Sequence, residues 1–136
     1  MIFNPKKQFN TDKKILLIDD NEGDLYFIQS WLEKNGFNVF KTNNPEEGIN
    51  LAKEHKPDII FSDYTMPKMT GAEICKALAS DPETSQIPVV ILTGLDSPSS
   101  IIASFEQGAQ DYVTKPFHMA KIGRQLKIIL KDYNLL

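Results

Sequence analysis

Residues 14–20 read KILLIDD: a lysine, four consecutive apolar residues and then two aspartates. An apolar run without polar alternation is typical of a parallel strand that is covered on both faces. A charged side chain at the end of such a strand is costly unless it is paired or used, because burial removes its hydration. The stretch therefore predicts a central strand over 15–18 that delivers Asp19 and Asp20 to a polar site.

Working outward from this strand, the chain alternates short apolar runs with segments of helical periodicity. Further strands are predicted over 37–40, 58–61, 88–92 and 111–114. Helices are predicted over 24–35, 45–55, 70–79, 98 to about 107, and 119 to about 132. Strands that alternate with helices indicate a parallel sheet with helices on both faces, and right-handed crossovers leave few topologies. The pattern predicts a flavodoxin-like, doubly wound (βα)5 α/β fold with strand order 2-1-3-4-5.

Length and composition agree with one domain. The 136 residues are 41% hydrophobic, with a net charge of −3 and a single cysteine. The weak negative charge argues against direct nucleic-acid binding, and no apolar run approaches the length of a membrane span. We therefore expect no membrane insertion. A single cysteine cannot form an internal disulfide, which favours a cytoplasmic protein. We assign 1–13 to an N-terminal tail, 14–132 to the domain and 133–136 to a C-terminal tail.

Four of the predicted strands end in polar or charged residues. These are Asp19–Asp20, Ser62–Asp63, Thr93–Gly94 and Thr114–Lys115. The carboxyl ends of parallel strands meet at one edge of the sheet, and ligands bind there at the point where the strand order reverses. Three carboxylates that face one lysine leave an excess of negative charge. Mg²⁺, which prefers oxygen ligands, would neutralise this excess.

The chemistry of this edge points to phosphoryl transfer rather than to a bound phosphate cofactor. The loop after the first strand, residues 20–24, is acidic and repels phosphate, which argues against a flavin nucleotide site. A metal ion, a lysine and a threonine hydroxyl are nevertheless what a transferring phosphoryl group needs. An aspartate can accept that group as a nucleophile and form an aspartyl-phosphate, and Asp63 is the candidate.

Four motifs carry a resemblance to a known family. They are ILLIDD at 15–20, DYTMP at 63–67 with Gly71, ILTG at 91–94 and DYVTKPF at 111–117. Together they resemble the receiver domain of two-component response regulators, over roughly residues 14–132. The resemblance implies that Asp63 accepts a phosphoryl group from a sensor histidine kinase or a phosphotransfer protein.

The resemblance also implies a Mg²⁺ cofactor held by Asp63, by Asp20 directly and by Asp19 largely through water. The backbone carbonyl of Thr65 would complete the metal site. One further implication is that the peptide bond between Lys115 and Pro116 is cis.

Other positions would contact the phosphoryl group or respond to it. The resemblance implies that Thr93 and Lys115 bind the phosphoryl oxygens, and that Gly94 leaves room for the group. Tyr112 matches an aromatic residue that changes orientation when Thr93 moves. The signalling face would then comprise the helix that begins at 98, the strand at 111–114 and the last helix.

The chain ends soon after its last predicted helix, so we expect a stand-alone receiver that signals to an unknown protein target. We expect no enzyme activity beyond its own Mg²⁺-dependent phosphorylation and dephosphorylation. One alternative is a phosphatase with an aspartyl-phosphate intermediate, but Thr65 stands where such enzymes carry a second aspartate. Another is a binding module of this fold that is never phosphorylated.

A few further residues have competing interpretations. Phe27 and Trp31 either widen the core face of the first helix or form an exposed patch that helps to dock the kinase. We expect neither His55 nor His118 to be a ligand or a phosphate relay. Cys75 is expected to be a small residue of a helix without a redox role.

Overall fold

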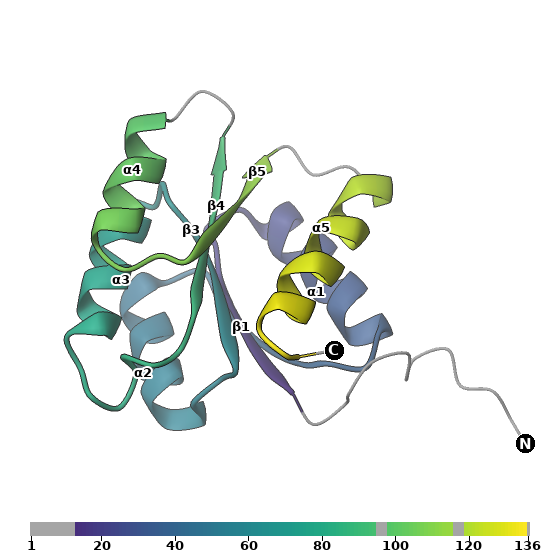
Figure 1. The fold of residues 1–136 in the computed structure, drawn as a ribbon, viewed down its shortest axis with the longest axis horizontal. Helices are drawn as coiled ribbons and strands as arrows, with labels where there is room; N and C mark the ends of the chain where they lie inside the picture. The colour runs from purple at the N-terminus through teal and green to yellow at the C-terminus, as the bar shows by residue number, and fades with distance from the viewer. Residues whose placement is uncertain (1–12, 95–97, 116–118, 136) are drawn as a thin grey trace, which may run out of the picture.

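The computed structural model describes residues 13–94, 98–115 and 119–135, and it contains a five-stranded parallel sheet of order β2-β1-β3-β4-β5 (Figure 1). The strands are β1 (Lys14–Ile18), β2 (Asn38–Thr42), β3 (Ile59–Asp63), β4 (Val89–Gly94) and β5 (Asp111–Lys115). The helices are α1 (Glu22–Lys34), α2 (Pro45–His55), α3 (Gly71–Ala79), α4 (Pro98–Glu106) and α5 (Met119–Asp132). The predicted fold class and strand order are confirmed.

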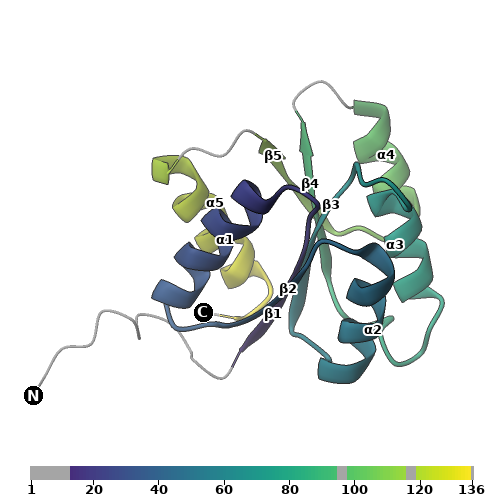
Figure 2. The same ribbon diagram turned by 180° about the vertical axis from the view of Figure 1, so that it is seen from behind.

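Two hydrophobic cores lie on opposite faces of the sheet. Helices α1 and α5 cover one face, and α2, α3 and α4 cover the other (Figures 1 and 2). Successive side chains of a strand point to opposite faces. In β1, accordingly, Ile15 and Leu17 join the core under α1 and α5, whereas Leu16 and Ile18 join the core under α2 and α3. This double burial explains why residues 15–18 of the strand are all apolar.

Helix starts are set by side chains that accept hydrogen bonds from free backbone N–H groups. The Asn21 side chain accepts a bond from the Asp24 N–H at 2.9 Å, so α1 begins at Glu22, two residues before the predicted start. Asn44 caps α2 in the same way ahead of Pro45. Such caps contribute about 1 kcal/mol each and orient the first turn of the helix toward the edge of the sheet.

The C-terminal end of the described chain folds back on the domain. Leu135, within the segment that the sequence pattern assigned to a tail, is 5% exposed and belongs to the core under α1 and α5. Its N–H donates to the Leu130 carbonyl at 2.8 Å. Tyr133 packs against the same core. Among the helices that the structure describes, none has the length and apolar character needed to cross a membrane.

The register of the strands decides which residues reach the site. Ile18 of β1 pairs with Ser62 of β3, so that Asp19 and Asp63 both come directly after this pair. On the other side of β3, Asp63 pairs with Leu92. Gly94 pairs with Lys115 at the ends of β4 and β5. The carboxyl ends of β1, β3 and β5 therefore present their charged residues along one edge.

Candidate functional site

Three carboxylates meet at the carboxyl ends of β1 and β3. Asp19, Asp20 and Asp63 each offer an oxygen atom, and these atoms lie within 4.8 Å of one another. Asp19 is fully buried and Asp63 is 6% exposed, whereas Asp20 is open to solvent. The set suits a hard divalent cation, because such ions prefer carboxylate oxygens and one of the three carboxylates remains accessible to solvent.

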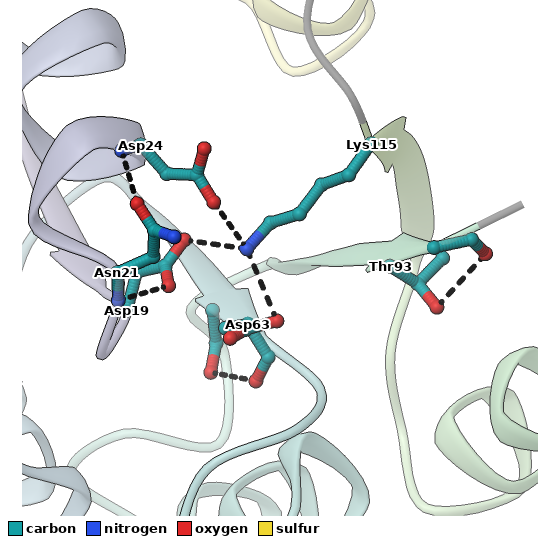
Figure 3. A network of polar contacts seen from close by, with 8 residues as sticks. Asp19, Asn21, Asp24, Asp63, Thr93 and Lys115 are labelled. Atoms are coloured by element: carbon teal, nitrogen blue, oxygen red, sulfur yellow. Dashed lines mark hydrogen bonds and ion pairs between the residues drawn. The ribbon is translucent and has the colours of Figure 1, made fainter.

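Lys115 reaches across from β5 and faces these carboxylates (Figure 3). Its Nζ lies 2.9 Å from Asp19 Oδ2 and 3.4 Å from Asp63 Oδ1. A third carboxylate, Asp24 on α1, lies closer still, with 2.6 Å between Lys115 Nζ and Asp24 Oδ2. The convergence of Asp63 and Lys115 agrees with the sequence prediction, whereas the contact with Asp24 was not predicted.

Asp24 is the residue of this network that sequence reasoning missed. The acidic loop was interpreted only as a source of repulsion toward phosphate, with the helix beginning at Asp24. A local signal was nevertheless present, since Asn21 is a favoured cap and Asp24 follows it by three residues. An N-cap at Asn21 places Asp24 in the first turn, at the edge of the sheet where Lys115 ends.

The acidity of Asp63 reflects both its burial and the excess of negative charge in the site. Burial, followed by the charge of Asp19, raises the pKa of Asp63 to about 7, although Lys115 acts in the opposite direction. Burial by itself would lower the pKa of Lys115, but hydrogen bonds with Asp24 and Asp19 outweigh it and raise that pKa. The lysine therefore stays charged, and it only partly compensates the carboxylates.

Thr93 and Tyr112, the predicted phosphoryl contact and switch residue, have contacts outside the carboxylate cluster. Thr93 is 2% exposed, and its hydroxyl faces the carbonyl of Gly94 at 3.5 Å, the limit of a hydrogen bond. In Figure 3 the hydroxyl is directed toward this carbonyl and not toward the contact between Lys115 and Asp63. The Tyr112 ring is 43% exposed and meets Phe105 edge to face, with 6.2 Å between ring centroids.

Gly71 lets α3 begin directly against the end of β3. A Cβ atom at this position would lie 2.9 Å from the Asp63 carbonyl oxygen and 2.9 Å from Tyr64 Cα. Because both neighbours are backbone atoms, they cannot give way as a flexible side chain would. The Gly71 N–H also donates to the Tyr64 carbonyl at 2.7 Å, which closes the loop after the proposed acceptor.

The remaining residues that the sequence analysis discussed contact the hydrophobic cores or other side chains of the domain. Phe27 and Trp31 are partly buried against the core under α1 and α5, as in the first of the two interpretations. The His55 ring stacks on Phe40 with 4.1 Å between centroids. Burial raises the pKa of the Cys75 thiol to about 12, so that this residue stays protonated.

Two predictions fall outside the described residues, namely the cis peptide bond at Pro116 and the expectation that His118 is neither a ligand nor a phosphate relay. The metal contact of the Thr65 carbonyl stays a prediction. So does the space that Gly94 leaves for a phosphoryl group.

Comparison with known proteins identifies the class. The sequence profile of the response regulator receiver domain matches residues 15–127. The chain is 36% identical over 117 residues to the protein PilH of Pseudomonas aeruginosa, covering 86% of this chain and 97% of PilH. It is also 36% identical to the alkaline phosphatase synthesis transcriptional regulatory protein PhoP of Bacillus subtilis, where it covers 88% of this chain but spans only 49% of PhoP.

A solved structure gives the same answer. The chemotaxis response regulator CheY4 of Vibrio cholerae superposes with a TM-score of 0.80 at 28% identity, covering 87% of this chain and 98% of CheY4. The chain therefore belongs to the receiver domains of two-component response regulators. Receiver domains bind Mg²⁺ at an acidic pocket, and this chain has a cluster of carboxylates, Asp19, Asp20 and Asp63, at the carboxyl ends of β1 and β3.

Proposed function

We propose that this protein is a phosphorylation-controlled signalling receiver. It takes a phosphoryl group onto Asp63 from the phosphohistidine of a sensor kinase or phosphotransfer protein, and it passes the change to a protein target through α4, β5 and α5. The observation that carries the proposal is the convergence of Asp19, Asp20 and Asp63 on one side, and Lys115 on the other, at the ends of β1, β3 and β5.

The residues present fit a Mg²⁺ ion. Asp19, Asp20 and Asp63 supply carboxylate oxygens within 4.8 Å of one another, and burial together with the charge of Asp19 raises the pKa of Asp63 despite the nearby Lys115. When bound, Mg²⁺ would offset this charge and that of the incoming phosphoryl oxygens. The Thr65 carbonyl is proposed as a further ligand.

The transfer itself needs one nucleophile and one cation from the chain. An ionised Asp63 oxygen attacks phosphorus, a P–O bond forms, and the P–N bond to the donor histidine breaks so that the imidazole leaves. Lys115 stabilises the charge on the phosphoryl oxygens. The backbone contacts around Gly71 keep Asp63 in place, so that little reorganisation accompanies the step.

Phosphorylation then supplies the energy for a change of conformation. It converts the single negative charge of Asp63 into nearly two and adds acceptor oxygens. In the proposed switch, Thr93 leaves its weak contact with Gly94 to bind these oxygens, and Tyr112 follows. New charge-assisted hydrogen bonds contribute about 1.5–3 kcal/mol each, against about 5.5 kcal/mol for a shift from 1:99 to 99:1. Two such bonds together contribute about 3–6 kcal/mol, so they supply most or all of the free energy of the switch.

The test is phosphorylation by acetyl phosphate in the presence of Mg²⁺, followed by intact-protein mass spectrometry. We expect the wild type to gain one phosphoryl group, and Asp63→Asn to gain none because the amide oxygen is a poor nucleophile. Chelation of Mg²⁺ should also prevent the modification.

Asp58→Asn is the matched control. Asp58 lies just before the opposite end of β3 and bonds the Lys14 N–H at 2.8 Å, away from the cluster. This variant should be modified like the wild type. A phosphorylated Asp63→Asn variant would move the acceptor to another residue, and an unmodified wild type would contradict the proposal.

A further inference from the structure

Among the carboxylates around Lys115, the one at the shortest distance is not the proposed phosphoryl acceptor. Lys115 Nζ is 2.6 Å from Asp24, 2.9 Å from Asp19 and 3.4 Å from Asp63 (Figure 3). Asp24 belongs to α1 and stands outside the cluster of Asp19, Asp20 and Asp63. The ammonium that the phosphoryl group would need is thus already held closely by a carboxylate with no part in the transfer.

The position of Asp24 is fixed by the start of α1. Its N–H donates to Asn21 Oδ1 at 2.9 Å, and the Asn21 N–H donates to Asp19 Oδ1 at 2.9 Å. The cap therefore links Asp24 to the same buried aspartate that binds the lysine. A carboxylate in the first turn is also favoured by the helix dipole, so the Asn21 cap and the dipole both stabilise Asp24 in this position.

A phosphoryl group on Asp63 would compete with Asp24 for the lysine. Lys115 is 19% exposed and Asp24 is 25% exposed at their side chains, so water screens the pair only in part. Movement of Nζ toward the phosphoryl oxygens lengthens the contact with Asp24. The charge of Asp24 in addition repels a second anion that arrives beside it.

We propose that Asp24 is a positioning residue that competes for the Lys115 ammonium and thereby weakens the grip of the site on a phosphoryl group at Asp63. The inference rests on the proposed function of Asp63 and adds a residue that tunes it. In this arrangement Asp24 holds the lysine in place in the unphosphorylated protein. It also keeps the phosphorylated state from becoming too stable to reverse.

The experiment measures the affinity for beryllium fluoride, a phosphoryl mimic, in MgCl₂ by NMR titration of backbone amides. Asp24→Asn keeps the shape of the side chain but removes its charge, and it should bind about tenfold more tightly than the wild type, or about 1.4 kcal/mol. Asp24→Glu keeps the charge and should stay within about threefold of the wild type, or roughly 0.7 kcal/mol. Asp24→Ser, a good residue for a first helical turn, serves as a second neutral variant should Asp24→Asn fold poorly.

Glu22→Gln is the matched control. Glu22 is exposed and shares the first turn of α1 with Asp24, so the substitution removes the same charge from the same turn. It should leave the affinity unchanged. An equal gain in affinity for beryllium fluoride in Glu22→Gln would attribute the effect to the net charge of the helix turn and would overturn the inference. Unchanged or weaker binding by the neutral Asp24 variants would also overturn it. A wild type that does not bind beryllium fluoride would instead contradict the proposed function itself.

Discussion

Helices α3 and α4 are neighbours on one face of the sheet and have the same length, yet they are held very differently. In α3, five of nine residues are buried, among them Ile74, Cys75 and Leu78. All nine residues of α4 are described, and only Ser104 is buried. Helix α4 instead exposes Ile102 at 59% and Phe105 at 42%.

The contrast between α3 and α4 agrees with their proposed roles, because α3 lies next to the proposed acceptor and α4 belongs to the proposed signalling face. Helix α3 begins against the Asp63 carbonyl, with no space at Gly71 for a side chain, so the acceptor end of the molecule is fixed by packing. Helix α4 has few buried apolar side chains, and elements of this kind open or shift at low free-energy cost. The proposed acceptor thus lies in a firmly packed part of the fold. The proposed signalling face includes α4, which can move at a low cost in free energy.

The largest expected effect separates the two helices by stability. Ile74→Ala removes a fully buried side chain of α3 and should lower the free energy of unfolding by about 3 kcal/mol, because a cavity remains in the core. Ile102→Ala in α4 is the matched change and should stay within about 0.5 kcal/mol of the wild type. Urea denaturation followed by circular dichroism measures both. Equal losses would show that α4 is as firmly packed as α3.

Charge crowding makes the rigid end sensitive to pH in the absence of metal. Burial and the charge of Asp19 raise the pKa of Asp63 from 3.8 to about 7. The folded protein therefore binds this proton more tightly than the unfolded chain, so its contribution is complete below about pH 4 and is lost as the pH rises through 7. Metal-free protein should lose of the order of 2 kcal/mol of unfolding free energy between about pH 5 and pH 8.

Asp63→Asn is the control for this pH dependence, since the amide does not titrate. The variant should lose much less stability over the same range, and urea titrations in chelator at several pH values compare the two proteins. Addition of Mg²⁺ at the upper pH should restore stability to the wild type, because the cation prefers the ionised carboxylate. A parallel pH dependence in the variant would place the titrating group elsewhere.

Much of the fold was predictable because its signals are local. The run at 15–18 is typical of a strand covered on both faces, and Asn44 before Pro45 indicates the start of α2. The start of α1 was placed two residues late, because Glu22 and Gly23 resemble a loop until the cap at Asn21 is recognised.

The site residues that follow directly after a strand could be predicted from the sequence, whereas those on helices could not. The contact between Asp24 and Lys115 joins two distant segments, and neither segment alone indicates it. The direction of the Thr93 hydroxyl depends on a side-chain rotation that the sequence does not determine. The burial of Leu135 likewise depends on a return of the chain after α5, which periodicity does not reveal.

A smaller effect is expected at the start of α3. Thr70 accepts a hydrogen bond from the Glu73 N–H at 3.1 Å, and Glu73 accepts one from the Thr70 N–H at 3.0 Å, so the two form a capping box. Thr70→Ala should cost about 1 kcal/mol of unfolding free energy in urea titrations, because both bonds are lost or weakened. Ser99→Ala, an exposed change in α4, should cost nothing or stabilise slightly. A neutral Thr70→Ala would mean that packing alone holds this end of α3.

The smallest effect on stability is expected on the exposed side of α4, where Phe105 meets Tyr112 edge to face. Phe105→Ala removes the contact between two exposed rings and should change the free energy of unfolding by less than about 1 kcal/mol. The aromatic proton shifts of Tyr112 should nevertheless move clearly in NMR spectra, because the ring current of Phe105 is lost. Ile128→Ala, at a 62% exposed position of α5, is the control and should leave both quantities unchanged. A decrease of more than about 2 kcal/mol in the free energy of unfolding of Phe105→Ala would show that α4 is firmly packed, and would contradict the contrast with α3.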